Sequence, residues 1–389
     1  MTAVAGALAF LTACSGPSAN PDTRERVPTR SGAKSPRVPS APDLRGESFD
    51  VRFARDGSGF ALLGECGSTG CRQRVAVLDQ GADAWRLGQS PLPDTTGSDG
   101  ITAGLTLLGP GRALLTEGRW PPPDRTWFTS DGGRHWRQGS SMPSGTTAVV
   151  PEDGVLVAGC LRADREGNDC EPSALLAVLP ATGQIRTLAA QPALEGELIP
   201  AGETAKPAEE DAGTLLFVSG RDPHSGRSAL AVSQDRGHRW RTSPLPGAAG
   251  QGRVTGVVAA GKVLYVARRG HLPEETNVKN GLLSLYRSTD DGRTWERVWR
   301  HRKGMEPRSI LGVPVAGADG SLTVHSEDGV WRSTDGGHSF TRRQGSGGPS
   351  GSVTTTSLGY LWADSFGAGS WRLSADGIRW ASFNVGGAA

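Results

Sequence analysis

The sequence predicts an all-β fold, a seven-bladed β-propeller built from four-stranded antiparallel blades. Three observations carry this prediction: a short motif that recurs along the chain, intervals of 40 to 55 residues between most of its copies, and the absence of helix-period apolar stretches beyond the N-terminus. Motifs that recur at such intervals are typical of propellers, in which each blade is one supersecondary unit.

The motif reads Ser/Thr-x-Asp-x-Gly-x-x-aromatic. Four full copies span residues 129–136, 233–240, 288–295 and 333–340, and a fifth copy, one residue shorter, spans 374–380. Their aspartate and aromatic positions are Asp131, Trp136, Asp235, Trp240, Asp290, Trp295, Asp335, Phe340, Asp376 and Trp380. Aspartate in a tight turn accepts backbone N–H bonds, glycine permits a positive φ, and the aromatic ring packs under the turn. Each copy is therefore expected to be a self-contained structural clip.

These copies resemble the Asp-box, or bacterial neuraminidase repeat, of sialidases, sortilin-type propellers and the photosystem II assembly-factor family. Residues 50–65 also resemble the opening of an assembly-factor blade, a Val-x-Phe strand followed by a polar turn and Gly-aromatic-Ala. The resemblance implies a propeller whose boxes lie away from the active face. It implies no particular ligand.

The number of blades follows from the spacing of the boxes. Trp136 and Trp240 are 104 residues apart (240 − 136), so this interval is expected to hold two units. The hidden unit at 175–188 parallels the first unit at 75–87, and the box is eroded in both. Seven blades would then occupy residues 47–389 and leave no room for a second domain. Strands of the fifth unit are expected at 253–259, 262–268, 282–288 and 294–299.

Residues 1–14 are expected to be a lipoprotein signal peptide. An apolar run at 4–11 leads into residues 11–14, Leu-Thr-Ala-Cys, which resemble a bacterial lipobox and imply lipidation of Cys14. The run is too short to span a bilayer. Residues 15–46, rich in Ser, Pro, Arg and Ala, are expected to form a disordered tether. We therefore expect an exported protein anchored to the outer face of the cell membrane, the competing interpretation being a chance cysteine in a frayed N-terminus.

The other four cysteines fit an exported protein. Cys66 and Cys71 bracket one predicted loop between second and third strands, and Cys160 and Cys170 bracket another. Two loop disulfides are the simplest pairing. A zinc site is the alternative, but no histidine stands at metal-ligand spacing from either pair, so no metal is expected.

Composition excludes several classes of function. The net charge is +2, from 42 Lys and Arg against 40 Asp and Glu, and no basic run is interleaved with aromatic residues, so no nucleic-acid surface is expected. Neither a Gly-x-Ser-x-Gly elbow nor a Walker-type phosphate loop is present. We expect a monomer without a cofactor.

Candidate ligand-binding residues lie on the loops between second and third strands, on the face opposite the boxes. These loops are long in the first five predicted blades and short in the last two. The candidate residues are Trp120, Arg162, Asp222, His224, Arg268, Arg269 and His271. Tryptophan offers a flat face to a sugar or a protein, and arginine forks suit carboxylates. The alternative is an ordinary solvated surface.

These features favour a non-catalytic, surface-tethered lipoprotein whose propeller binds a protein or glycan partner at the cell envelope. The alternative is a sialidase-like exo-glycosidase, which requires three arginines on a carboxylate, a tyrosine nucleophile and a Phe/Tyr-Arg-Ile-Pro segment. That segment is absent, and Tyr265, Tyr286 and Tyr360 fall in predicted strands. A general glycoside hydrolase needs paired carboxylates, and the spacing does not select a pair among the acidic loop residues. A purely structural spacer is the third interpretation.

Overall fold

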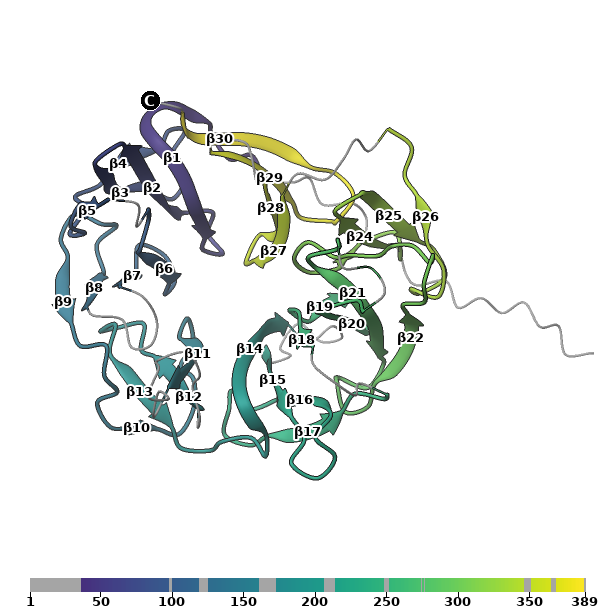
Figure 1. The fold of residues 1–389 in the computed structure, drawn as a ribbon. Helices are drawn as coiled ribbons and strands as arrows, with labels where there is room; N and C mark the ends of the chain where they lie inside the picture. The colour runs from purple at the N-terminus through teal and green to yellow at the C-terminus, as the bar shows by residue number, and fades with distance from the viewer. Residues whose placement is uncertain are drawn as a thin grey trace, which may run out of the picture.

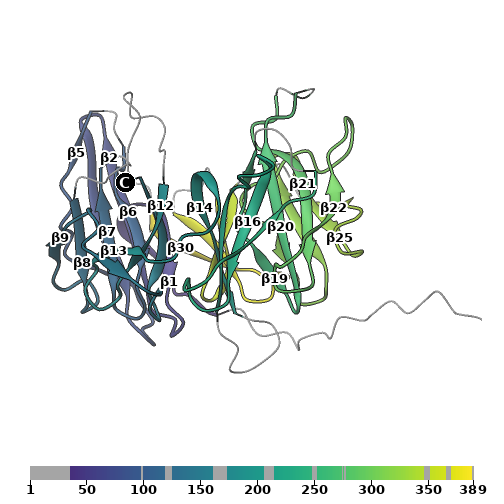
Figure 2. The same ribbon diagram turned by 90° about the horizontal axis from the view of Figure 1, so that it is seen from below.

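The computed structural model describes residues 36–97, 100–118, 125–160, 173–205, 214–247, 252–273, 275, 277–345, 351–364 and 369–387. All regular elements in this part of the chain are β-strands. Their sheets stand side by side in a ring (Figure 1), and the strands run from one face of the ring to the other (Figure 2). The predicted all-β propeller architecture is confirmed.

Five of the six hydrogen-bonded sheets each correspond to one repeat unit. The first two are β6 (Gly104–Leu107), β7 (Ala113–Glu117), β8 (Arg125–Thr129) and β9 (Arg137–Gly139), followed by β10 (Thr146–Thr147), β11 (Val155–Cys160), β12 (Ser173–Val178) and β13 (Ile185–Leu188). The next is β14 (Glu195–Ala205), β15 (Thr214–Arg221), β16 (Ser228–Ser233) and β17 (Arg241–Pro244). The last two are β18 (Arg253–Val254), β19 (Val258–Ala260), β20 (Val263–Gly270), β21 (Gly281–Ser288) and β22 (Glu296–Arg300), then β23 (Val315–Ala316), β24 (Leu322–Ser326), β25 (Gly329–Ser333) and β26 (Thr341–Arg342).

The sixth sheet has nine strands and closes the ring. It joins β1 (Ala41–Phe53), β2 (Gly59–Gly67), β3 (Gly70–Leu78), β4 (Arg86–Leu87) and β5 (Thr95–Thr96) to β27 (Ser352–Thr356), β28 (Gly359–Ala363), β29 (Ser370–Ser374) and β30 (Ala381–Gly387). The joint is a parallel pairing of β1 with β30, which lie side by side in Figure 1. The Trp371 indole N–H donates to Ser48 Oγ across the same joint, at 2.7 Å. Hydrogen bonds between the chain's two ends therefore close the ring, and the count of seven separate blades stays a prediction.

The structure places the start of the propeller before the expected boundary at residue 47. Strand β1 begins at Ala41, Val38 and Leu44 pack against the apolar cluster between the two ends, and the Trp85 indole N–H donates to Pro39 O at 2.9 Å. These residues were expected in the tether because they are polar and proline-rich. Pairing with β30 orders them, and that strand is remote in sequence.

One sheet departs from the expected antiparallel order. Strand β10 pairs in parallel with β13, at the rim of the ring, so β11 lies nearest the centre (Figure 1). The incoming chain satisfies free backbone groups of β13: Ser144 N–H donates to Ile185 O at 2.8 Å, and Thr187 N–H donates to Gly145 O at 3.0 Å. This sheet therefore has three antiparallel strands and one parallel strand.

The box turns form the clips that the sequence predicts. Asp131 Oδ1 accepts the Thr129 hydroxyl at 2.9 Å and the His135 N–H at 3.0 Å. Gly133 has a φ of 72°, and its N–H donates to Thr129 Oγ1 at 3.0 Å. The same bonds are made by Ser233 and Asp235, Ser288 and Asp290, and Ser333 and Asp335. In the short copy Asp376 accepts the N–H groups of Ile378 and Arg379, each one position earlier than in the full copies.

Each box also packs against the sheet that precedes it. The rings of Trp136 and Phe60 pack in a T-shaped arrangement with centroids 6.4 Å apart, and the Trp136 indole N–H donates to Gln89 O at 2.7 Å. A Cβ on Gly133 would lie 3.2 Å from the Val77 side chain. Gly237, Gly292, Gly337 and Gly377 approach Leu188, Phe217, Val298 and Val315 in the same way. Trp295 is buried, at 6% exposure, whereas Trp136, Trp240, Phe340 and Trp380 are half-buried.

The box aspartates predict acid sensitivity. Desolvation favours protonated Asp335, but the hydroxyl and N–H of Ser339 and the Ser333 hydroxyl outweigh it and lower its pKa from 3.8 to about 2. A carboxyl whose folded-state pKa is lowered stabilises the fold above its unfolded pKa, and this stabilisation is lost as the pH falls through the folded value. We expect the urea concentration at the unfolding midpoint to decrease as the pH is lowered from 4 to 2, and to decrease less in Asp335→Asn than in the native protein. An equal decrease in the two proteins would contradict this prediction.

The disulfide prediction is met at one of its two positions. Cys66 and Cys71 face each other across the β2–β3 hairpin and are bonded. The expected loop at 65–72 is mostly strand, because β2 and β3 extend to a two-residue turn. Cys160 ends β11 and Cys170 lies outside the described residues, as does Cys14.

Candidate functional site

Five of the seven loop residues predicted from the sequence lie within the described part of the chain, and their surroundings differ. Trp120 and Arg162 lie outside the described residues. Arg268 belongs to β20, is 4% exposed, and its Nε donates to Ser228 Oγ at 3.2 Å, because β20 extends to Gly270. Arg268 is therefore part of the packing between β20 and β16, which corrects its expected place in a loop.

Asp222 also has a structural partner. Its carboxylate accepts the N–H of Ser225 at 2.9 Å and the Ser225 hydroxyl at 2.5 Å, and this hydroxyl holds the pKa of Asp222 below its ordinary value. Asp222 caps the β15–β16 turn. Arg269 also belongs to β20, where it is half-buried and pairs with Arg253, which corrects its expected place in a loop. His224 and His271 are exposed and remain available on the loop face.

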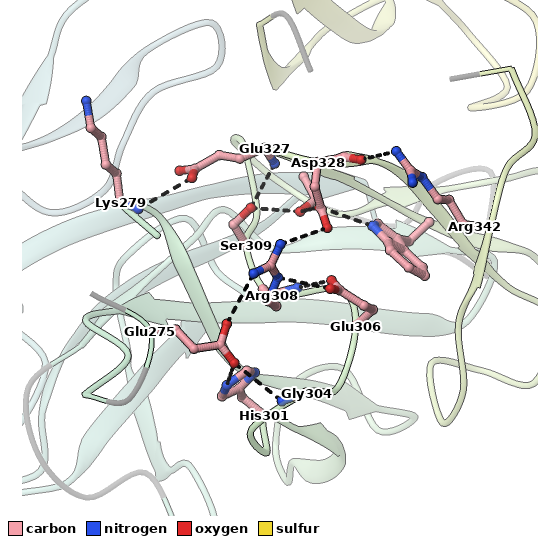
Figure 3. A network of polar contacts seen from close by, with 12 residues as sticks. Glu275, Lys279, His301, Gly304, Glu306, Arg308, Ser309, Glu327, Asp328 and Arg342 are labelled. Carbon is pink, nitrogen blue, oxygen red and sulfur yellow. Dashed lines mark hydrogen bonds and ion pairs between the residues drawn. The ribbon is translucent and has the colours of Figure 1, made fainter. Parts of the chain in front are cut away.

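A polar network lies on the same face and joins two neighbouring sheets (Figure 3). It comes from three segments: the β20–β21 loop, the connection from β22 to β23, and the β24–β25 turn. At its centre, Arg308 Nε lies 2.9 Å from Glu306 Oε1, while its NH2 lies 3.6 Å from Asp328 Oδ2 and its NH1 3.7 Å from Glu275 Oε2. One guanidinium therefore holds three carboxylates, as Figure 3 shows.

The outer contacts of the network fix its backbone. Glu275 Oε1 lies 3.4 Å from His301 Nε2, and both side chains are nearly buried, at 10% and 13% exposure. Glu327 Oε1 accepts the backbone N–H and the side-chain amide of Asn280, each at 3.0 Å. The Glu327 N–H donates to Ser309 Oγ at 2.8 Å. The loop after β20 is therefore tied to the β24–β25 turn.

The pKa values of two carboxyl groups in this network, Glu306 and Asp328, are shifted in opposite directions from their ordinary values. Burial and the neighbouring Asp328 carboxylate raise the pKa of Glu306, although Arg308 opposes this. Burial acts to raise the pKa of Asp328, but hydrogen bonds with Ser326 and Glu306 lower it. Two carboxyl groups with oppositely shifted pKa values are typical of the general acid and general base of an enzyme. Because Glu306 and Asp328 interact directly, however, they leave no room for the sugar that glycosidase carboxylates flank at about 5–10 Å.

The three tyrosines lie inside the sheets. Tyr265, Tyr286 and Tyr360 are 6%, 0% and 8% exposed. The Tyr360 hydroxyl accepts the N–H of Ala316 at 3.1 Å, and burial raises its pKa to about 12. A buried phenol that stays protonated is a poor nucleophile.

Most of the network was not predicted from the sequence. Glu275 lies in one of the long loops expected between second and third strands, but His301, Glu306, Arg308 and Asp328 do not. The dense charge of residues 301–308, His-Arg-Lys-Gly-Met-Glu-Pro-Arg, was a usable signal. The meeting of these side chains in one network could not be predicted, because it depends on how neighbouring sheets pack against each other.

The described residues contain no cluster of three or more histidine, cysteine, aspartate or glutamate side chains placed to hold a metal ion. Nor does any helix there have the length and apolar character needed to cross a bilayer.

Comparison with known proteins reveals likeness at the level of solved structures. No protein-family model and no curated protein matches the chain. YCF48 bound to a D1 peptide is 13% identical, with 90% of this chain and 84% of that chain covered and a TM-score of 0.34. The α-L-arabinanase of Penicillium chrysogenum, complexed with arabinobiose, is 11% identical over 92% and 95% of the chains, with a TM-score of 0.37. Apo prolyl oligopeptidase B of Galerina marginata is 11% identical over 88% and 51%, with a TM-score of 0.49.

Proposed function

We propose that this protein is a non-catalytic, surface-tethered lipoprotein whose propeller binds a protein or glycan partner at the cell envelope, through the face that bears the β15–β16 and β20–β21 loops. The observation that carries this proposal is the network around Arg308. The Arg308 guanidinium lies within ion-pair distance of Glu275, Glu306 and Asp328, and so ties the β20–β21 loop to the β24–β25 turn. A preorganised polar surface binds with a smaller entropy loss than a loose one.

The lipid tether is part of this proposal. Cys14 would carry the lipid, and the chain between residue 15 and Val38, which packs against the propeller, would separate the propeller from the membrane. We expect Cys14→Ser to move the protein from the membrane fraction to the soluble fraction of expressing cells. Unchanged membrane association of this variant would refute lipid anchoring at this residue.

Crosslinked capture from intact cells tests the binding face. The test variant replaces the exposed His224 and His271 with glutamate, and the matched control replaces the exposed box-turn residues His238 and His338 with glutamate. We expect the test variant to lose a defined envelope component that the native protein and the control retain, with all three proteins unfolding at similar urea concentrations. Equal capture by both variants would contradict the assignment of this face.

A glycoside hydrolase is the second candidate. The observation that favours it is the raised pKa of Glu306 beside Asp328. The buried tyrosines and the direct interaction of these carboxyls argue against it. Turnover of a fluorogenic glycoside that is abolished by Glu306→Gln would favour the hydrolase, whereas absence of turnover across a panel that includes sialosides would favour binding.

A further inference from the structure

A second polar site lies between two neighbouring sheets. A pocket of about 900 Å³ opens between β24 and β25 on one side and β28 and β29 on the other. This volume is within the usual range for small-molecule sites, roughly 300–1,000 Å³, and exceeds what an inorganic anion needs. The box-turn residues Ile378 and Trp380 contribute to its wall.

Aromatic rings form one wall of this pocket. The Trp362 ring centroid lies 5.6 Å from that of His325 and 6.4 Å from that of Trp380. The Trp362 indole N–H is buried and has no hydrogen-bond partner within the described part of the chain. A buried donor without a partner is costly, and a ligand oxygen in the pocket would satisfy it.

The charged side chains that line the pocket are all basic. Arg332, Arg343 and Arg372 are among its lining residues, and no carboxylate is. Arg332 pairs with Asp319, outside the lining. Arg372 is exposed, and its guanidinium carbon lies 4.0 Å from the centroid of the Trp362 ring. Burial, with Arg343 and Arg372 nearby, lowers the pKa of His325 to about 4, so its imidazole is neutral near pH 7.

We propose that this pocket binds an acidic sugar, a saccharide unit that carries a carboxylate or a sulfate. The Arg372 guanidinium would bind the anionic group, since arginine forms charge-assisted, bidentate hydrogen bonds with carboxylates and similar oxyanions. The aromatic rings would contact the apolar face of the sugar ring. Side chains of Thr323 and Gln344, also in the lining, supply hydrogen-bonding groups for sugar hydroxyls. The hydroxyls of Ser321 and Thr341 already donate to Asp319 and to Arg332 O, so they can only accept from a ligand.

This inference goes beyond the proposed function, because it names a ligand class and a site apart from His224 and His271. The two can fail separately. Loss of sugar binding would leave partner capture by the loop face untouched, and a failed capture would not alter the affinity of the purified protein for a sugar.

Calorimetric titration of the purified full chain tests the inference. The probes are digalacturonate, which is acidic, digalactose as its neutral counterpart, and inorganic sulfate. We expect digalacturonate to bind at least about tenfold more tightly than either of the other two. Equal binding of digalactose, or of sulfate alone, would overturn the acidic-sugar assignment, as would the absence of binding by all three.

Matched variants locate the site. Arg372→Gln should weaken digalacturonate binding by about tenfold or more, the typical effect of one charge-assisted bond. Trp362→Phe keeps a ring and removes the indole donor, so it should weaken binding about three- to tenfold. The control is Arg137→Gln, since Arg137 also lies over an aromatic ring, that of Phe128 at 5.6 Å, but in another sheet. Unchanged affinity in Arg372→Gln, or equal loss in the control, would place the sugar elsewhere.

Discussion

Trp295→Ala should lower the free energy of unfolding by about 3–5 kcal/mol, because it removes a large buried aromatic side chain. Trp295 is 6% exposed and belongs to an apolar cluster with Phe217 of β15 and Leu264 of β20. Its loss would leave a cavity between two neighbouring sheets. Urea unfolding followed by far-UV circular dichroism measures the change.

Two variants separate packing from hydrogen bonding in this box. The Trp295 indole N–H is buried and makes no hydrogen bond within the described residues, so Trp295→Phe should cost clearly less than Trp295→Ala. Asp290→Ala removes the bonds from Thr294 and Ser288 and should cost about 1–2 kcal/mol, as loss of a cap does. If Asp290→Ala were the more damaging, the box would act mainly through its turn, and our assignment of Trp295 would be wrong.

Gly386→Ala should destabilise the joint between β30 and β1 by about 2–5 kcal/mol, the sum of two effects. Its φ of 80° costs a residue with a Cβ about 1–2 kcal/mol. The new Cβ would also lie 2.1 Å from Gly46 O and 3.0 Å from a Leu63 methyl, and overpacking of this kind typically costs about 1–3 kcal/mol.

Gly57→Ala is the control for this experiment. Gly57 has nearly the same φ, 84°, but a Cβ there would meet nothing within 4 Å. Gly57→Ala should lower the free energy of unfolding only by the cost of a positive φ at a residue with a Cβ, about 1–2 kcal/mol. The difference between the two variants, measured by urea unfolding, isolates the close approach of β1 and β30. Equal losses would mean that this parallel pairing does not hold the ring closed.

Short sequence motifs are enough to predict the local elements of this protein. In the full boxes the aspartate accepts hydrogen bonds from residues three or four positions ahead, and Gly133 provides the positive φ of its turn. One hairpin of the fifth unit was also placed correctly, since β20 and β21 lie within two residues of their expected bounds, whereas the expected strand at 253–259 is divided into β18 and β19. Such features depend on a few consecutive residues, so a motif is enough to specify them.

The packing of whole sheets sets the joint of β1 with β30, the parallel position of β10, the burial of Arg268 and the convergence of the network around Arg308. The Trp371 indole reaches Ser48 across 323 positions of sequence, Glu275 meets Arg308 from another segment, and Arg372 shares a pocket with His325 of the preceding sheet. These contacts join residues that no local pattern relates. The physical reason is that each depends on the relative placement of whole sheets, which is set by packing around the ring rather than by any short stretch of chain.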